Sequence, residues 1–443
     1  MGAISSIYFA IFIPLIAALL CQVFHKKIVV FSITFLSCVA LLLLFLKTYP
    51  VTLAKEFILN DFNLSNPSLA LEFKLDKLSI IFLVLFICLK LITLVFYKSD
   101  IERNLNENNH KIFYSVFLFN VFGLVGIFTT NNIFNLFLFT EIFSFGFFAS
   151  LFVLRNQKLL KISFKYFCIS AASSLLILFS FFIIYLITKE TNLDLISQKL
   201  SLISSGNSEI LWLIFLFLSA GFVVKFFPFW LYFKKIKNTG FNADFLSINI
   251  LFIKPLVGIF LVRKFTYLLF QNNFFANSGL LIILLILSVL LIVYSALELC
   301  RQKHLRTIAA YLSLNNLGCI LSAIILQNPI ADKAIIFYLL NFILLNSAIF
   351  IFATFLKKRY FTSAINKIYM IENNHFFLTL PLKIIVLLIA GIPFTFLFFA
   401  NWSLMNAAFA MDVRIILLAA LIFSAFMQLQ LATKMVSYFY AKK

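Results

Sequence analysis

Long apolar runs recur along the whole chain and are separated by short polar connections. Because a helix rises about 1.5 Å per residue, roughly 20 apolar residues cross the hydrocarbon core of a bilayer. Runs of spanning length lie at about 4–24, 28–47, 78–97, 112–130, 132–154, 163–188, 210–233, 243–269, 277–299, 306–327, 331–356, 376–408 and 412–434. This pattern predicts an all-α polytopic membrane protein with about 13 transmembrane helices.

The composition agrees with a membrane protein. Of the 443 residues, 63% are hydrophobic and only 12% are charged, and the mean hydropathy is +1.07. A soluble globular domain does not need so much apolar surface. The first apolar stretch, from Ile4 to Leu20, has no basic flank before it and no small-residue cleavage site after it. We therefore expect it to be retained as a helix.

Positive charge gathers in alternate connections between the predicted helices. The chain carries 36 Lys and Arg against 16 Asp and Glu, a net charge of +20. Basic clusters in the odd-numbered connections lie at 25–27, 155–161, 234–237, 301–306 and 357–367, and the C-terminal tail is also basic. Since short cytoplasmic loops are rich in Lys and Arg, this pattern predicts that the N-terminus lies outside and the C-terminus in the cytoplasm. The expected location is the bacterial inner membrane. Arg263 and Lys264 form the one basic pair on the other face.

No residue pattern indicates a metal or a cofactor. The six Cys lie singly, without a Cys-x-x-Cys pair or a Cys/His cluster. No Gly-rich phosphate loop follows a predicted strand. The basic residues are explained by topology, so nucleic acid is not an expected partner. We expect no cofactor, no metal ion and no catalytic site of the chain's own.

Proline and glycine interrupt two of the predicted spans. Pro228 lies late in helix 7, and Gly391-Ile392-Pro393 interrupts helix 12. Breaks in corresponding spans of two halves suggest an inverted repeat, in which broken helices bring polar groups to the middle of the membrane. A proline in a membrane helix is also tolerated as a simple kink. The breaks favour N-terminal helices 1–3 at 1–110, a first five-helix repeat at 111–270 and a second at 271–443.

Glu141 is the only charged residue between Ile133 and Leu154. An acid in the middle of an apolar helix is costly, so it should face a partner or a water-filled path instead of lipid. Lys165, Lys225 and Lys254 also lie within apolar helices and are candidate partners. Two interpretations follow, a proton or ion relay and an ion pair that only locks helices together.

Lysines within the membrane suit a relay because their proton affinity depends on their surroundings. Burial lowers the pKa of a lysine and a nearby carboxylate raises it, so a Glu–Lys pair whose separation changes can act as a proton switch. Lys254 lies near mid-membrane, whereas Lys165 is close enough to the helix end to reach the interface. His304 lies among basic residues that set topology, and catalysis is its less favoured role. Asn315 and Asn316 are expected to form hydrogen bonds between helices, with relay positions as the alternative.

Several segments resemble the proton-conducting antiporter-like membrane subunits of respiratory complex I and of Mrp-type multisubunit cation/proton antiporters. Leu124 to Phe128 and Asn135 to Ile142 are similar to the fourth and fifth helices of that family. Supporting similarities lie at 163–167, 221–222, 227–229, 254–258, 306–313 and 390–393, so the resemblance covers about residues 110–410.

The resemblance implies a fold with two inverted five-helix repeats, each with a broken helix. It also implies a Glu in helix 5, a Lys in each of helices 7 and 8, and a Lys or Glu in helix 12. Glu141 and Lys254 match this pattern and Lys165 matches the helix 6 pattern. Two positions depart from it. Val223 occupies the helix 7 lysine position, with Lys225 two residues later and ~200° around the helix. Asn401 occupies the helix 12 position.

By this resemblance the chain is a membrane subunit of a multisubunit proton-translocating complex, most similar to the D-type subunit of Mrp antiporters. Its expected partners are other membrane subunits, the lipid bilayer and protons, with Na⁺ as a candidate exchanged ion. One alternative is an N-type or M-type subunit of NADH-quinone oxidoreductase, the only enzymatic context that the sequence suggests. The other is a structural subunit that conducts no ions, which the residues at positions 223 and 401 favour.

Overall fold

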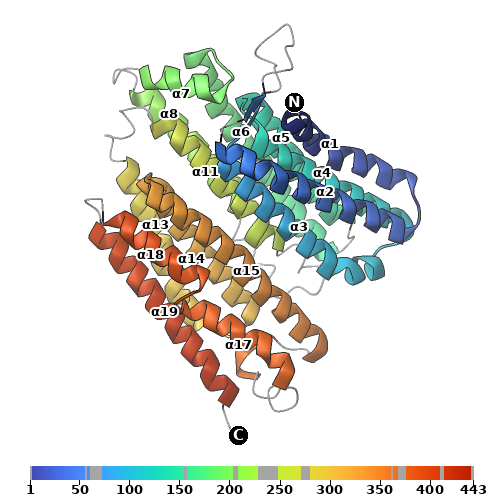
Figure 1. Ribbon diagram of the computed structural model, residues 1–443, viewed down its shortest axis with the longest axis vertical. Coiled ribbons are helices and arrows are strands. Elements are labelled where there is room, and N and C mark those ends of the chain that lie inside the picture. The colour runs from blue at the N-terminus through green and yellow to red at the C-terminus, as the bar shows by residue number, and fades with distance from the viewer. Residues whose placement is uncertain are drawn as a thin grey trace. The chain divides into compact units, whose positions relative to one another are not determined.

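A computed structural model describes residues 2–54, 57–59, 72–153, 157–202, 208–227, 248–270, 280–360, 363–367, 376–409 and 414–440, and nearly all of these residues are helical. The helices of the first part are α1 (Gly2–Val23), α2 (Lys27–Ala54), α3 (Lys77–Asn104), α4 (Glu107–Thr129), α5 (Ile133–Val153), α6 (Gln157–Thr188), α7 (Leu193–Leu202), α8 (Ser208–Phe226) and α11 (Lys254–Phe270) (Figure 1). They are followed by α13 (Leu280–Arg301), α14 (Leu305–Leu326), α15 (Pro329–Tyr360), α17 (Phe376–Ala390), α18 (Phe396–Ala408) and α19 (Arg414–Tyr440). Two short strands, β1 (Phe57–Leu59) and β2 (Phe73–Leu75), pair antiparallel.

The structure confirms an all-α multi-pass membrane protein. Within the described residues, 10 helices are long and apolar enough to span a bilayer. The predicted number of thirteen spans is therefore not confirmed. The short helix α7 was not predicted, because its 10 residues carry an amphipathic pattern within a connection and not an apolar run.

The predicted break in helix 12 is present in the structure. α17 ends at Ala390, and Gly391 and Phe394 then have φ angles of +64° and +72°. These left-handed conformations cannot continue a helix and are least costly at glycine. α18 begins after Thr395, whose side chain accepts a hydrogen bond from the backbone N–H of Phe398 at 3.3 Å. The other predicted break, at Pro228, lies outside the described residues.

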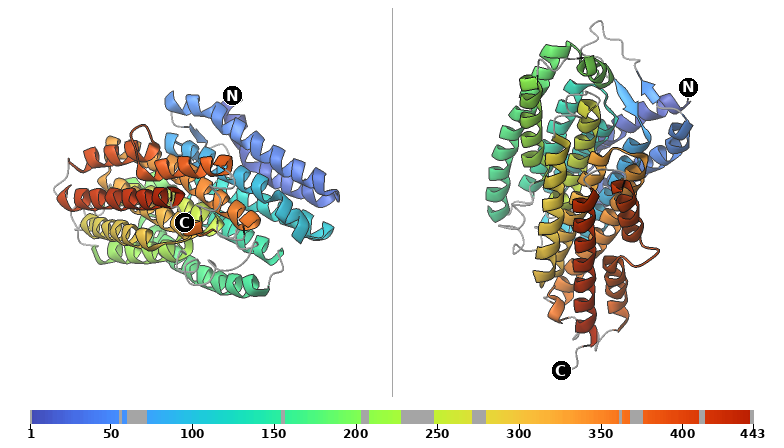
Figure 2. Two further views of the ribbon diagram at one scale, coloured as in Figure 1. Left: turned by 90° about the horizontal axis from the view of Figure 1, so that it is seen from below. Right: turned by 90° about the vertical axis from the view of Figure 1, so that its left-hand side faces the viewer.

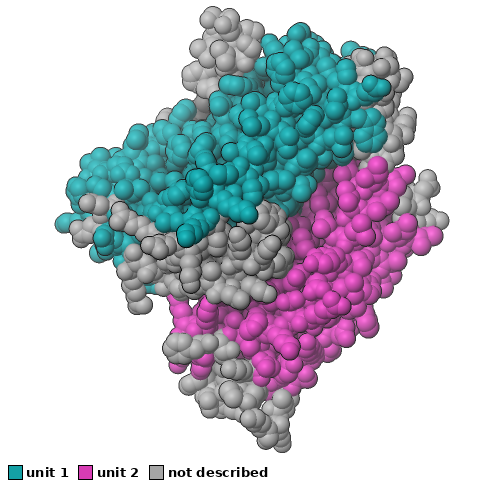
Figure 3. Space-filling model, turned by 180° about the vertical axis from the view of Figure 1, so that it is seen from behind, with its two compact units in different colours: residues 1–231, 239–274 teal, residues 232–238, 275–443 magenta. Residues whose placement is uncertain are grey.

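The contacts divide the chain into two compact units, which Figure 3 colours separately. Unit 1 comprises residues 1–231 and 239–274, and unit 2 comprises residues 232–238 and 275–443. In unit 1, α4 packs on α5 and α6 on α8, whereas in unit 2, α13 packs on α14 and α15 on α18. Two corresponding pairs of helices thus pack together in the two units. The predicted division at 1–110, 111–270 and 271–443 stays a prediction.

Small residues allow α4 and α5 to approach closely in unit 1. A Cβ added at Gly123 would lie 2.6 Å from the backbone nitrogen of Phe143, and one at Gly146 would lie 2.8 Å from the Cβ of Asn120. Neither distance leaves room for a side chain. In membranes, where helices gain no hydrophobic advantage over lipid, such small residues let backbones pack against each other. The contact sets Glu141, on α5, in a fixed register against α4.

In unit 2, α14 packs between α13 and α15, and α19 packs along α13 (Figure 2). Asn315 of α14 donates hydrogen bonds to the carbonyl oxygen of Ile292 at 3.2 Å and to Ser295 Oγ at 3.1 Å, both on α13. Its own Oδ1 accepts a hydrogen bond from Gln428 of α19 at 3.0 Å. Asn315 therefore joins three helices, which is the interhelical role expected for it.

Candidate functional site

Glu141 of α5 and Lys225 of α8 form an ion pair inside unit 1. Lys225 Nζ donates to Glu141 Oε1 and also to Ser174 Oγ of α6, at 2.9 Å. The side chain of Lys225 is completely buried, whereas that of Glu141 keeps 21% of its surface exposed. The sequence placed both groups within the membrane, and the structure brings them into contact although they lie 84 residues apart.

The register of α8 decides which of its residues reaches Glu141. Val223, at the position where the family pattern has lysine, is 59% exposed. Lys225 is two residues further on, about 200° around the helix, and faces the interior. The departure from the family pattern at Val223 therefore does not remove the amine from α8, because Lys225 supplies it from the next buried position.

Tyr166 of α6 links this ion pair to Lys254. Its hydroxyl donates a hydrogen bond to the backbone carbonyl of Lys225 at 2.7 Å and accepts one from Lys254 Nζ at 2.9 Å. The preceding residue, Lys165, is a candidate from the sequence, and its side chain lies on the exposed surface of α6. Adjacent residues on a helix point ~100° apart, so only one of the two can face this interior. The structure groups Glu141, Lys225 and Lys254, and Lys165 lies apart from them.

Lys254 lies in an aromatic cage near the middle of unit 1. Only 1% of the residue is exposed. Its Nζ lies 4.3 Å from the ring centroid of Phe147, 5.0 Å from that of Phe148 and 4.3 Å from that of Tyr166. The electron-rich faces of aromatic rings attract a cation at these distances. The cage can therefore hold a protonated amine in a place where water does not solvate it.

A π-helical turn, η4 (Asn249–Ile253), leads directly into Lys254. The backbone N–H of Lys254 donates to the carbonyl of Asn249, five residues earlier. In a regular α-helix, residues five apart point in directions that differ by ~140° around the helix axis. A hydrogen bond between residues i and i+5 brings their positions on the helix closer to the same face. Pro255 follows, and it has no N–H to donate to a regular ladder. The irregular turn thus aligns Asn249 with Lys254.

A further buried lysine, Lys90 of α3, lies in the same unit. Its Nζ donates to Asn120 Oδ1 at 2.6 Å and to Asn249 Oδ1 at 3.5 Å, and lies 4.9 Å from the ring centroid of Phe117. Only 2% of the residue is exposed. Lys90 is not among the residues predicted from the sequence, although it is a charged residue inside a predicted span, as Glu141 is.

Contact between the charges of Glu141 and Lys225 makes their proton affinities interdependent. Two unit charges 4 Å apart attract by about 4 kcal/mol at an effective dielectric constant of ~20, and the attraction falls as they separate. Contact therefore favours the doubly charged state, and separation favours transfer or release of the proton. Ser174 Oγ, already bonded to Lys225 Nζ, is a second partner that the amine keeps if the carboxylate withdraws.

Lys264 belongs to the one basic pair that the sequence places on the face opposite to the other basic clusters. Its amine lies in a polar cluster of unit 1. Lys264 Nζ donates to the carbonyl of Thr130, the C-cap of α4, where the helix dipole favours a cation. Nearby, Lys74 pairs with Asp194 at 3.1 Å, and Asn192 donates to Glu72. Burial of Glu72 raises the pKa of its carboxyl group, with smaller increases from the negative charges of Asp194 and Glu190, against the hydrogen bond from Asn192.

Unit 2 has a neutral side chain, Asn401, at the helix 12 position where the family pattern has a Lys or Glu. Asn401 of α18 accepts a hydrogen bond from Tyr338 of α15 at 2.5 Å. Pro393 lies in the break between α17 and α18. His304 is exposed at the N-cap of α14 and pairs with Ala364 as an isolated bridge. All three residues belong to unit 2, and no described salt bridge of that unit lies within its buried interior.

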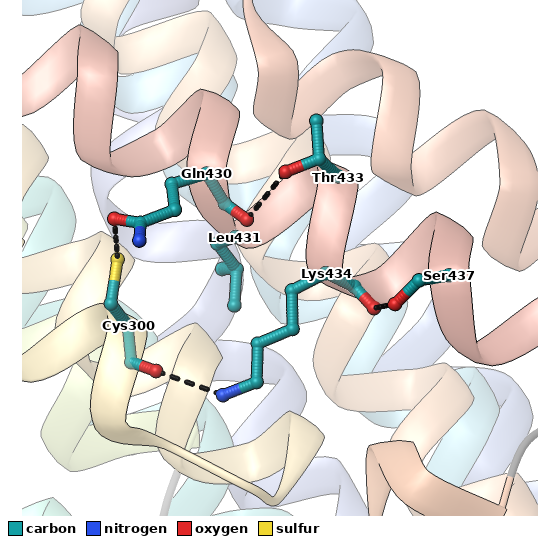
Figure 4. A pocket seen from close by; sticks show the side chains of 6 residues that line it. All are labelled: Cys300, Gln430, Leu431, Thr433, Lys434 and Ser437. Atoms are coloured by element: carbon teal, nitrogen blue, oxygen red, sulfur yellow. Dashed lines mark hydrogen bonds between the residues drawn. The ribbon is translucent and has the colours of Figure 1, made fainter.

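A separate pocket of about 480 Å³ lies between α13 and α19 (Figure 4). Lys434 Nζ donates to the carbonyl of Cys300 at 3.1 Å, and the Cys300 thiol lies 3.7 Å from Gln430 Oε1. The residues that line it are Cys300, Gln430, Leu431, Thr433, Lys434 and Ser437. This pocket shares no residue with the buried charges of unit 1. Among the described residues, no group of three or more His, Cys, Asp or Glu side chains could hold a metal ion.

Known proteins resemble this chain in sequence and in fold. The family described as NADH:quinone oxidoreductase/Mrp antiporter, TM, matches residues 130–427. The D subunit of the Na(+)/H(+) antiporter of Alkalihalophilus pseudofirmus is 27% identical over 320 residues, which cover 71% of this chain and 63% of that protein. The N subunit of the NADH-quinone oxidoreductase of Chlorobium chlorochromatii is 25% identical over 295 residues, which cover 64% of this chain and 56% of that protein. The chain thus spans less than two thirds of the length of either relative.

Among solved structures, a chain of the Mrp complex from Dietzia sp. DQ12-45-1b superposes with a TM-score of 0.83 at 18% identity. The superposition covers 100% of this chain and 81% of that one. At this identity the likeness shows a shared fold and nothing further. It confirms the predicted fold class, that of antiporter-like membrane subunits.

Proposed function

Because this chain belongs to the NADH:quinone oxidoreductase/Mrp antiporter transmembrane family, we propose that it is a membrane subunit of a multisubunit proton-translocating complex. We further propose that it moves protons through the buried Glu141–Lys225–Lys254 group of unit 1. The observation that carries this proposal is the ion pair of Lys225 with Glu141, joined through Tyr166 to a third buried charge at Lys254. Intramembrane ionisable groups that contact one another are the usual constituents of proton relays.

The proposed relay works by changing the distance between Glu141 and Lys225. When they are in contact, the carboxylate and the ammonium stabilise each other and the proton stays on the amine. When they separate, Lys225 keeps Ser174 as a partner and loses the charge that held its proton. The proton can then leave towards Lys254. Tyr166 bonds the backbone of Lys225 and not its amine, so the transfer requires a water molecule or a movement of the Lys225 side chain.

Unit 1 is proposed to contain the charged part of the relay, because Asn401 and Tyr338 in unit 2 form a neutral hydrogen bond. An amide cannot bind and release a proton as a lysine or a carboxyl group does. The same observation favours the alternative of a structural subunit without conduction, so the two must be separated by experiment. Lys165 stands outside the proposed relay because its side chain lies on the exposed surface.

We propose a bacterial inner-membrane location, which the bacterial relatives support. The basic odd-numbered connections support an N-terminus outside and a C-terminus in the cytoplasm. The proposed partners are other membrane subunits. The relative from Alkalihalophilus pseudofirmus favours an Mrp-type assembly that exchanges Na⁺ for protons. The relative from Chlorobium chlorochromatii favours an NADH-quinone oxidoreductase instead.

The test begins with gentle purification of the chain from its native membrane and identification of the subunits that accompany it. Mrp-type subunits would favour antiport, and flavin and iron–sulfur subunits would favour a respiratory complex. The intact assembly is then reconstituted in vesicles, and proton uptake is measured for Lys254→Ala and for Lys77→Ala, an exposed lysine on α3. We expect Lys254→Ala to abolish proton transport and Lys77→Ala to leave it unchanged. Normal transport by a fully assembled Lys254→Ala complex would leave the structural role as the better account.

A further inference from the structure

Lys90 is buried, and no described carboxylate forms a salt bridge with it. Within the described part of the chain, its amine forms hydrogen bonds only with the amide oxygens of Asn120 and Asn249. A neutral donor such as an amide or a hydroxyl could hold the same two oxygens without burying a charge. A lysine in this position is therefore a costly choice for a purely structural contact, which indicates that its charge is used.

The site around Lys90 is built from four elements of unit 1. Asn120 of α4 donates through Nδ2 to the carbonyl of Phe143 on α5 at 2.6 Å, which fixes its Oδ1 towards Lys90 on α3. Asn249 approaches from the π-helical turn η4. Gly146 of α5 has no side chain, and a Cβ there would lie within 3 Å of Asn120. The amide acceptors of Lys90 are thus held in place by packing.

A small cavity beside Lys90 extends to Phe147, one of the three rings of the aromatic cage of Lys254. It has a volume of about 10 Å³ and is lined by Lys90, Phe117, Asn120, Gly146, Phe147, Ser150 and Asn249. This volume is close to the minimum that holds one water molecule, and its lining offers several polar partners. Phe147 belongs to both sites, because Lys254 Nζ lies 4.3 Å from its ring centroid. Asn249 also joins the two lysines, because its carbonyl accepts the backbone N–H of Lys254 while its side chain accepts from Lys90 Nζ.

We propose that Lys90 is a further proton-carrying residue, which exchanges its proton with Lys254 through water in this cavity. One N–H bond breaks at the Lys254 ammonium, the water passes the proton on, and one N–H bond forms at the Lys90 amine. The charge moves from one lysine to the other and the total is unchanged. This inference rests on the proposed function of unit 1 and extends its relay to α3.

The experiment measures proton uptake by the reconstituted assembly with Lys90→Gln and Lys90→Arg. Glutamine keeps a neutral donor for Asn120, whereas arginine keeps the positive charge but cannot give up its proton. Both should lower the initial rate about tenfold or more, as the loss of a proton-transfer group does. Lys77→Gln, an exposed lysine on the same helix, is the matched control and should not alter the rate. A rate near that of the unmodified complex with either Lys90 variant would show a structural anchor and overturn the inference.

Two further variants test the role of Lys90 if its own variants do not assemble, and separate it from the proposed relay. Ser150→Val fills the cavity and leaves Lys90 in place, so it should slow proton uptake even where the Lys90 variants fail to assemble. Unchanged uptake by an assembled Ser150→Val complex would overturn the inference. Lys254→Ala in the same preparation separates the two proposals. If it abolishes uptake and the Lys90 and Ser150 variants do not slow it, only the role of Lys90 falls. If Lys254→Ala leaves uptake intact, the relay and its extension both fall.

Discussion

The ion pair between Glu141 and Lys225 predicts an energetic coupling that a double-mutant cycle can measure. The variants are Glu141→Gln, Lys225→Met and the two together. Exposed ion pairs contribute about 0.2–1 kcal/mol, and removal of one partner from a fully buried pair costs about 3–5 kcal/mol. Here one side chain is completely buried and the other is 21% exposed. We therefore expect a coupling of about 2 kcal/mol, between these limits.

The two single variants should differ in how much stability they lose. Glu141→Gln leaves the Lys225 amine buried with Ser174 as its hydrogen-bond partner. Lys225→Met leaves the Glu141 carboxylate, whose remaining exposure allows it some solvation. Because an unpaired buried charge is the costlier outcome, Glu141→Gln should destabilise the protein more than Lys225→Met does.

The assay is reversible unfolding of the purified chain in mixed detergent, with the free energy of unfolding compared across the four proteins. Variants that do not interact are additive within about 0.3–0.5 kcal/mol. A coupling below about 0.5 kcal/mol would refute the ion pair as the structure presents it. The reversed order of the single variants would refute the argument from burial.

Three further predictions test neighbouring parts of the account. Tyr166→Phe removes the acceptor of Lys254 and should cost about 1–3 kcal/mol of unfolding free energy, measured in the same assay. Lys165→Ala should leave proton uptake by the assembly within about twofold, since exposed substitutions away from a site are usually near neutral. For Glu72, the raised pKa means that the folded protein binds this proton more tightly than the unfolded chain does, so its contribution to stability is lost as pH rises through the folded pKa. Between about pH 4.5 and about pH 7, the melting temperature should therefore fall less in Glu72→Gln than in the unmodified protein. An equal fall in the two proteins would contradict this.

The helices could be predicted from the sequence because the bilayer imposes a length that apolar runs must meet. The break in helix 12 was also predictable, since Gly391-Ile392-Pro393 interrupts its apolar run, and Gly391 adopts a left-handed φ angle there. The amphipathic helix α7 was missed because its signal is a short periodicity within a polar connection.

The partners of the buried charges were beyond sequence reasoning because they depend on helix rotation. A shift of one residue turns a side chain by ~100°, and this separates the buried Tyr166 from the exposed Lys165. The same geometry makes Lys225 the inward residue of α8 and Val223 the outward one. Lys90 could have been flagged by its charge alone. Its acceptors, however, lie 30 and 159 residues away, so only the folded chain identifies them.

The most direct test of the proposed relay moves the α8 lysine without changing the composition. The double variant Val223→Lys with Lys225→Val has the same net charge and the same residues, but its amine would lie at the position that is 59% exposed. Proton uptake by the reconstituted assembly should fall to the rate of Lys225→Val alone, because the amine no longer reaches Glu141. Uptake close to that of the unmodified assembly would contradict the account, since the relay would then not depend on the contact between Lys225 and Glu141.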